Sequence, residues 1–158
     1  MERNIKITKL TKADIEKTKE LIREYLKWID LDLTFQNIDE ELDNFPEKYE
    51  EPAGAFYIAK DGINVIGCIG LRKIRAKICE MKRLYVKDEY KGLGLGKMLI
   101  RTIIEEAKKK GYEKMRLDTL PKMQTAQKLY QEFGFVEVTK YTVNPVDGAV
   151  FMEKLLRE

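Results

Sequence analysis

The chain has 158 residues, a length that fits one domain with a buried hydrophobic core. Its 30 basic and 27 acidic residues leave a net charge of only +3, which does not suggest nucleic-acid binding because such proteins carry a marked basic excess. The absence of histidine excludes Ser-His-Asp and Cys-His catalysis and HExxH zinc sites, so any chemistry uses carboxylates, tyrosine, lysine, thiols, water or backbone groups.

Residues 4–10 alternate apolar and polar side chains, a pattern that predicts a short strand. Residues 11–29 predict a helix, because apolar residues recur at helical spacing from Ile15 to Ile29 and Thr11 stands where a capping residue is expected. Residues 37–45 indicate a second, shorter helix that ends at Pro46.

Three strand-like runs follow at residues 54–60, 64–74 and 78–86. The Asp61-Gly62 pair between the first two runs is a strong hairpin signal, and residues 75–77 are typical of a second tight turn. These signals predict an antiparallel meander of three strands.

The second half of the chain alternates helices and strands. Residues 97–111 predict a helix, since apolar residues recur every four positions, lysines near its end complement the helix dipole and Gly111 suits the position after it. A strand over 114–120, a helix over 121–134 and strands over 135–141 and 148–156 complete the pattern. The order β-α-α-β-β-β-α-β-α-β-β predicts an α/β fold around a mixed sheet.

A glycine-rich loop with Gly92, Gly94 and Gly96 lies between a predicted strand and a predicted helix. The first amides of a helix lack partners within the helix and carry a partial positive charge, and glycine lets a phosphate approach the backbone closely. A plain tight turn, the alternative, needs only one or two glycines. Three glycines in five positions therefore favour a phosphate site.

The glycine spacing fits neither of two common nucleotide-binding loops. A Walker A loop needs GxxxxGK followed by Ser or Thr, but Lys91 and Met98 stand where the first glycine and the magnesium-binding hydroxyl belong. A dinucleotide fingerprint needs GxGxxG after an early strand, whereas the spacing here is GxGxG in the second half of the chain.

The loop instead resembles the signature of the GNAT N-acetyltransferase superfamily, Gln/Arg-x-x-Gly-x-Gly/Ala, at the start of a helix that follows a strand. The preceding KRLYV, residues 82–86, is similar to the family's central strand, and AQKLYQEFGF, residues 126–135, is similar to its AxxLYxxxGF segment. Two positions depart from the family. Lys91 replaces the usual glutamine or arginine but keeps a cation near the phosphate, and Met123 stands where many members carry asparagine.

This resemblance implies a GNAT-like fold in one acetyltransferase domain over residues 1–158, with acetyl-CoA as cosubstrate and no metal. The fold is a mixed, mostly antiparallel sheet of about six or seven strands flanked by about four helices. The pantetheine arm would pair with the backbone of Leu84, Tyr85 and Val86, which requires a splayed strand pair, expected between residues 83–86 and 115–120. The diphosphate would bind amides of the loop residues Lys91, Gly92, Leu93, Gly94, Leu95, Gly96 and Lys97.

The resemblance also implies catalytic roles. Tyr130 matches the tyrosine of the LYxxxGF segment and is the candidate acid for the leaving thiolate; a ring packed on the sheet is the alternative. Glu80 matches a catalytic glutamate of some members and is the candidate base, acting through water; a surface pair with Lys82 is the alternative. The backbone N–H of Val86 is expected to stabilise developing charge. Asp118 either holds the acceptor amine or orients the following helix.

The acceptor amine is expected at an acidic and aromatic rim formed by the first two helices and the last two strands, unless these residues form only a solvated helix face over core aromatics. Residues 71–77 are basic and are expected to be a solvated hairpin rather than a nucleic-acid patch. The rim residues are Trp28, Asp30, Asp32, Phe35, Asp39, Glu40, Glu41, Asp43, Tyr141 and Asn144.

The resemblance thus implies direct transfer of an acetyl group from acetyl-CoA to a primary amine, expected to be that of a small molecule, within a ternary complex. The alternatives are a non-catalytic acyl-CoA sensor, a protein acetyltransferase acting on lysine or N-termini, and a nucleotide-dependent enzyme. Dimerisation is common in the family, so a homodimer is compatible with this prediction, although no interface stands out in the sequence.

Charged residues begin at Glu2, and no apolar run of about 18 residues occurs, so neither a signal peptide nor a membrane span is expected. A cytoplasmic location and the absence of a membrane partner follow as expectations. Cys68 and Cys79 both lie in strand-like runs and are expected to be buried free thiols.

Overall fold

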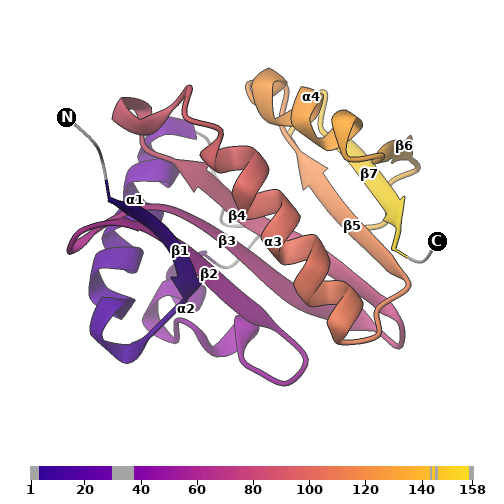
Figure 1. The fold of residues 1–158 in the computed structure, drawn as a ribbon. Coiled ribbons are helices and arrows are strands. Elements are labelled where there is room, and N and C mark those ends of the chain that lie inside the picture. Colours follow the sequence, from indigo (N-terminus) through magenta and orange to yellow (C-terminus); the bar gives the residue numbers. More distant parts are fainter. Residues whose placement is uncertain (1–3, 30–37, 143, 145, 157–158) are drawn as a thin grey trace.

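The computed structural model describes residues 4–29, 38–142, 144 and 146–156 (Figure 1). The predicted order of helices and strands is confirmed within these ranges. In chain order the elements are β1 (Ile5–Lys9), α1 (Ile15–Ile29), α2 (Ile38–Asp43), β2 (Ala55–Asp61), β3 (Asn64–Arg75), β4 (Ile78–Val86), α3 (Leu95–Lys109), β5 (Lys114–Thr119), α4 (Gln124–Glu132), β6 (Val136–Val138) and β7 (Val150–Leu155).

The strands form one seven-stranded sheet in the order β1-β2-β3-β4-β5-β7-β6. Neighbouring strands run antiparallel except β4 and β5, which are parallel because α3 crosses over between them. The mixed, mostly antiparallel sheet predicted from the sequence is therefore confirmed. One strand is shorter than predicted: β6 ends at Val138, and the chain then turns so that Tyr141 reaches Glu80.

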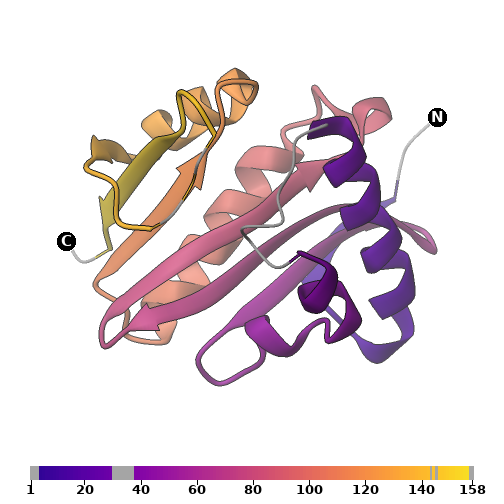
Figure 2. The same cartoon turned by 180° about the vertical axis from the view of Figure 1, so that it is seen from behind.

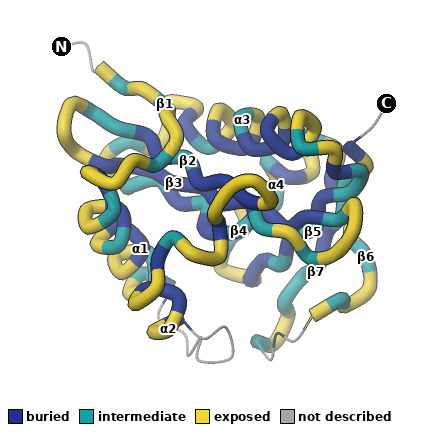
Figure 3. The backbone as a smooth tube through the Cα atoms, turned by 90° about the horizontal axis from the view of Figure 1, so that it is seen from below, coloured by how far each residue is buried: buried dark blue, intermediate teal, exposed yellow. Residues whose placement is uncertain are grey.

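Helices cover both faces of the sheet. Figure 1 shows α3 and α4 in front of it, and Figure 2, the view from behind, shows α1 and α2 on the opposite face. Strand β3 lies between these layers and buries seven consecutive residues, Val65 to Leu71, as expected for a strand covered on both sides. Figure 3 shows the same concentration of buried residues in the central strands.

The start of α1 differs from the prediction. A short 3-10 turn, Lys12–Asp14, precedes the helix, and the Thr11 hydroxyl donates to the carboxylate of Asp14 at 3.1 Å instead of capping a helix amide. The carboxylate also accepts from Lys60 at 3.1 Å, so this turn is tied to β2.

Strand β4 contains a β-bulge at Arg83. Lys82 pairs with Gly70 and Tyr85 with Cys68, so two residues of β4 lie opposite Ile69 alone. Arg83 takes a left-handed backbone conformation, with φ of +62°, which costs a non-glycine residue about 1–2 kcal/mol. The extra residue places the neighbouring side chains of Lys82 and Arg83 on the same face of the sheet.

After Glu80, before the bulge, β4 and β5 separate. They pair only over Ile78 to Glu80 and Lys114 to Arg116, although β4 continues to Val86 and β5 to Thr119. The splay lies where the sequence predicted it. It leaves one edge of the second half of β4 without a strand partner in the described chain.

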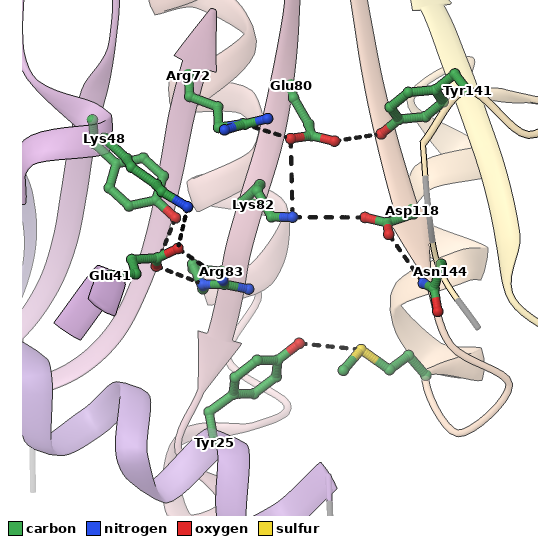
Figure 4. Close-up of polar contacts among 12 residues, drawn as sticks. Tyr25, Glu41, Lys48, Arg72, Glu80, Lys82, Arg83, Asp118, Tyr141 and Asn144 are labelled. Carbon is green, nitrogen blue, oxygen red and sulfur yellow. Dashed lines mark hydrogen bonds and ion pairs between the residues drawn. The ribbon is translucent and has the colours of Figure 1, made fainter. Parts of the chain in front are cut away.

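A buried ion pair holds the bulge in place. The Arg83 guanidinium donates from Nε to Glu41 Oε2 and from Nη2 to Glu41 Oε1, both at 2.9 Å (Figure 4). The Tyr49 hydroxyl also donates to Glu41 at 2.9 Å, and both charged residues are less than a tenth exposed. Bidentate geometry and this third hydrogen bond offset the cost of removing two charges from water. The pair joins α2 to β4 across 42 residues of sequence.

We expect Glu41→Gln to lower the free energy of unfolding by about 3 kcal/mol, because the buried Arg83 guanidinium loses its carboxylate partner. Urea denaturation measures this difference. The matched control is Glu40→Gln on the exposed side of α2, which should stay within about 0.5 kcal/mol of wild type. Equal losses in the two variants would contradict a stabilising role of the pair.

The same pair predicts a pH dependence. Burial by itself raises the pKa of Glu41, but Arg83, Tyr49 and Lys48 outweigh it and hold this pKa below its ordinary value of 4.5. The carboxylate therefore stabilises the fold fully above pH 4.5, and this contribution is lost as the pH falls through the lowered pKa. Stability should fall less steeply below pH 4.5 in Glu41→Gln than in wild type.

Candidate active site

The three glycines of the loop before α3 serve two structural purposes. Gly92 and Gly94 have φ of +85° and +79°, a region that side chains rarely adopt, and a Cβ at either would meet no atom within 4 Å. Gly96 lies inside α3, which begins two residues earlier than predicted, and a Cβ there would stand 3.2 Å from the Leu129 side chain of α4. The first two glycines shape an open loop, and the third lets α3 and α4 approach.

The amides at the start of α3 are free to bind a ligand. Gly94 occupies the N-cap position without a side-chain cap, and the amides of residues 93–97 find no acceptor in the part of the chain that the structure describes. Because α3 has fifteen residues, its dipole adds partial positive charge at this end. Free amides and a helix dipole together make an anion-binding site.

A cavity of about 320 Å³ extends from this loop toward the splay. It is lined by the second half of β4, the loop and the start of α4, with Tyr25 and Trp28 of α1 as a further wall. Lys91 and Lys122 lie over the Trp28 ring, 5.2 and 4.8 Å from its centre. All the predicted cofactor residues except Leu93 line this cavity; Leu93 is exposed on the loop.

A smaller cavity of about 50 Å³ adjoins the first at Tyr25, Leu84 and Met123 and lies in the splay itself. Met123 therefore occupies a position between the two, and its sulfur accepts from the Tyr25 hydroxyl at 3.6 Å. No local pattern in the sequence marks Tyr25 for this position, because its partner lies 98 residues away. The two cavities are thus neighbours, one at the free amides of α3 and the other in the space between β4 and β5.

Tyr130 lines the small cavity from α4. Its ring packs against Phe135 with centres 5.9 Å apart, and the residue is 6% exposed. Its hydroxyl makes no hydrogen bond to any described residue. Burial, with smaller effects of Tyr25 and Asp118, raises the pKa of Tyr130, so the phenol stays protonated at neutral pH. Tyr130 therefore has both the packed ring expected from the alternative and the protonated hydroxyl that the predicted acid role requires.

Glu80 is the last residue of β4 that pairs with β5, and it lines neither cavity. Its carboxylate accepts from the Tyr141 hydroxyl at 2.6 Å and from Arg72 Nε at 2.8 Å, and Lys82 Nζ is 3.9 Å away (Figure 4). Burial raises the pKa of Glu80, but Lys82, Tyr141 and Arg72 outweigh it and lower the pKa below its ordinary value. Glu80 is therefore an ionised carboxylate in a buried network.

Asp118 of β5 faces Lys82 across the splay. Its carboxylate accepts from Asn144 at 3.0 Å, lies 4.0 Å from Lys82 Nζ and lines the small cavity. It does not cap α4, whose N-cap is Met123 without a side-chain cap. Thr119, next in β5, lines the same cavity and keeps a buried hydroxyl that has no partner within the described residues.

The acidic rim predicted for the acceptor is only partly present. Glu41 is buried in its pair with Arg83, whereas Asp39, Glu40 and Asp43 are exposed on α2. Asp30, Asp32 and Phe35 lie outside the described residues. The basic hairpin is solvated as predicted at Lys73, Arg75 and Lys77, which are exposed, whereas its Arg72 hydrogen-bonds to the buried Glu80. Charged side chains near the splay are thus arranged differently from the sequence-based prediction.

Within the described residues, no group of three or more His, Cys, Asp or Glu side chains gathers as a metal site would require. No helix among them is long and apolar enough to span a membrane. Cys68 and Cys79 are free and buried, as predicted, and burial raises the pKa of each thiol to about 12, so neither is an activated nucleophile.

Comparison with known proteins identifies similar chains along most of this length. The family model described as Acetyltransferase (GNAT) family matches residues 19–135. An uncharacterised N-acetyltransferase of Schizosaccharomyces pombe is 42% identical over 141 residues, which cover 88% of this chain and 86% of that protein. The uncharacterised N-acetyltransferase YsnE of Bacillus subtilis is 33% identical over 113 residues, 70% of this chain and 75% of that protein.

Two solved structures extend this similarity to the fold. A GNAT-family acetyltransferase from Staphylococcus aureus has a TM-score of 0.83 and 26% identity, covering 97% of this chain and 99% of that one. The PaiA N-acetyltransferase of Thermoplasma acidophilum, crystallised in complex with coenzyme A, has a TM-score of 0.71 and 27% identity, covering 96% and 99%. Sequence, fold and loop geometry agree, and the chain belongs to the GNAT family of acetyltransferases.

Proposed function

We propose that this protein transfers the acetyl group of acetyl-CoA directly to the primary amine of a small-molecule acceptor. One observation carries the proposal: the free amides of α3 lie at one cavity, and the hydroxyl of Tyr130, which has no hydrogen-bond partner among the described residues, lies at the adjoining cavity. An anion site and a proton donor separated in this way suit a long phosphorylated thioester. Coenzyme A in the related PaiA structure supports the choice of carrier.

The residues present fit acetyl-CoA, which supplies the activated acetyl thioester. The amides that open α3 would bind its diphosphate, and the open space beside Gly92 and Gly94 leaves room for the phosphates. The unpaired edge of β4 would hydrogen-bond the amides of the pantetheine arm, as an added strand does. The proposed contacts are the backbones of Leu84, Tyr85, Val86, Lys91, Gly92, Leu93, Gly94, Leu95, Gly96 and Lys97.

We assign Tyr130 the role of general acid. Its buried hydroxyl keeps its proton and has no competing acceptor among the described residues, so it is available to a thiolate leaving in the splay. The Val86 N–H stays the predicted donor to the oxygen on which charge develops. Because no acyl-enzyme nucleophile is required, a ternary complex is the simplest mechanism for these groups.

The identity of the base stays a prediction. Glu80 is ionised, but the small cavity is lined by Asp118 and not by Glu80, so Glu80 would act only through a water or a neighbour. Asp118 lies closer to the reacting centre and is proposed to hydrogen-bond the acceptor amine. The small volume of this cavity, about 50 Å³, favours the amine of a small molecule over a folded protein surface.

A single acetyltransferase domain over residues 1–158 is supported by the sheet, which joins β1 near one end of the described chain to β7 near the other. A cytoplasmic location and a homodimer are retained as predictions. A protein acceptor is the second candidate, and it differs in requiring a lysine or N-terminus that reaches into the splay.

The direct test of the proposed function uses acetyl-CoA with a panel of primary amines. We expect free thiol to appear only when a suitable amine is present, since transfer releases coenzyme A. Stabilisation of the protein by acetyl-CoA without thiol release on any acceptor, peptides included, would identify a sensor and refute an enzyme.

Cofactor binding is tested by Gly94→Glu. Saturating acetyl-CoA, at about 100 times its Kd, should stabilise wild type by about 2.7 kcal/mol in thermal unfolding. The carboxylate in Gly94→Glu repels the diphosphate, so this stabilisation should vanish. Gly62→Glu is the matched control, because Gly62 also has a positive φ, +62°, and open space around a Cβ but lies in the β2–β3 turn. Loss of binding in both variants would point to general misfolding instead.

Tyr130→Phe tests the general acid. We expect kcat to fall about 100-fold, because the thiolate leaves without a proton donor, while the Kd for acetyl-CoA changes less than about twofold. Tyr112→Phe removes a hydroxyl on the same face of the sheet that donates to the Ala53 carbonyl at 2.7 Å, far from the cavities, and serves as control. A wild-type rate in Tyr130→Phe would remove Tyr130 from the acid role.

A further inference from the structure

We propose that the acceptor is an α-amino acid, whose carboxylate binds Lys82 while its amine hydrogen-bonds to Asp118. This inference rests on the proposed function and names its substrate class. It is supported by the charges of one group of side chains, which we call the acceptor floor. The acceptor floor consists of Arg72, Glu80, Lys82, Asp118 and the adjoining Glu41–Arg83 pair (Figure 4). These side chains share the face of the sheet that is opposite α3.

The carboxylates of the acceptor floor are covered, and so is Arg83, whereas Lys82 and Arg72 are more exposed than the carboxylates. The side chains of Glu41, Glu80 and Asp118 are 3%, 3% and 7% exposed. Lys82 is 15% exposed, Arg72 36%, and Lys48, beside Glu41, 39%. A molecule that enters over this floor therefore meets positive charge first, which favours an acceptor that carries an anionic group in addition to its amine.

The pairing of charges singles out Lys82. Glu41 binds Arg83 and Glu80 binds Arg72, each through hydrogen bonds of 2.8 to 2.9 Å. Lys82 Nζ instead lies 3.9 Å from Glu80 and 4.0 Å from Asp118, too far for a hydrogen bond to either. Within the described residues its ammonium group donates to no acceptor, although it lines the small cavity with Tyr130. A mostly buried ammonium with three unused N–H groups is a ready site for an anion.

The surroundings of Lys82 select a carboxylate rather than a dianion. Glu80 and Asp118 stand on either side of the ammonium group, so a phosphate with two charges would face two nearby negative groups. Burial lowers the pKa of Lys82 even though both carboxylates oppose this shift, which means that its ammonium is poorly solvated. A single bound carboxylate would replace part of the missing solvation.

The distance between the two binding groups fixes the spacing within the acceptor. Lys82 Nζ and Asp118 Oδ1 are 4.0 Å apart and line the same small cavity. They are thus suited to an amine and a carboxylate attached to one carbon, as in an α-amino acid. In this pose the amine lies in the cavity that Tyr130 lines, while the side chain of the amino acid points out of the splay.

The test compares three matched acceptors for each of several side chains: the α-amino acid, its carboxamide and the corresponding amine that lacks the carboxyl group. We expect kcat/KM, from release of free thiol, to be roughly 10- to 100-fold higher for the amino acid than for either analogue, as for one charge-assisted hydrogen bond. Equal or faster turnover of the analogues would overturn this inference and leave the proposed function intact. No turnover of any amine would overturn both.

Lys82→Met keeps the length of the side chain and removes its charge. We expect the preference for the amino acid over its carboxamide to fall to about one, chiefly through a higher KM for the amino acid. Lys73→Met is the matched control: Lys73 neighbours Arg72 in β3 but is exposed and points to the other side of the sheet, so its variant should keep the wild-type preference. An unchanged preference in Lys82→Met, with a wild-type thermal midpoint, would assign the carboxylate to another group and overturn the proposal.

Discussion

The bulge at Arg83 is the constraint on which the site depends. A non-glycine residue at φ of +62° is unfavourable by about 1–2 kcal/mol, and its conformation persists because the guanidinium is fixed by Glu41 in a bidentate, buried pair. The bulge coincides with the divergence of β4 from β5, and it turns Lys82 and Arg83 to the same face. One local distortion thus accompanies both the opening proposed to hold the cofactor and the charges proposed to face the acceptor.

Backbone groups supply most of the binding surface proposed for the cofactor. Free amides at the start of α3 and the unpaired edge of β4 exist because a helix begins and a strand ladder stops there, whatever side chains are present. This explains how a chain with a net charge of only +3 presents an anion site. Gly96 adds a geometric requirement, since a Cβ there would stand 3.2 Å from the Leu129 side chain of α4, which would have to shift by a few tenths of an ångström.

Whether a feature could be predicted from the sequence depends on how far apart its interacting residues lie along the chain. Periodicity, turn residues and the glycine loop are local, so the order of elements, the loop and the splay were predicted, and Tyr130 followed from a motif. The Glu41–Arg83 pair joins residues 42 apart, and Tyr141 reaches Glu80 across 61. Neither partner carries a local signal. For that reason the sequence predicts an acidic rim that includes Glu41, whereas Glu41 is bound in a buried pair, and it predicts no partner for Arg72, which hydrogen-bonds to the buried Glu80.

Long-range pairing also determines how the site handles protons without histidine. The pKa values of Glu41 and Glu80 lie below their ordinary range and those of Tyr130 and Tyr141 above it, so these groups keep one protonation state around neutral pH. The charges of these four side chains therefore stay constant around neutral pH. The proton that an acceptor amine must lose therefore passes to solvent or to the carboxylate of Asp118, since the ammonium group of Lys82 can only donate. The side chain proposed to hold the acceptor amine thus lies where its proton would leave.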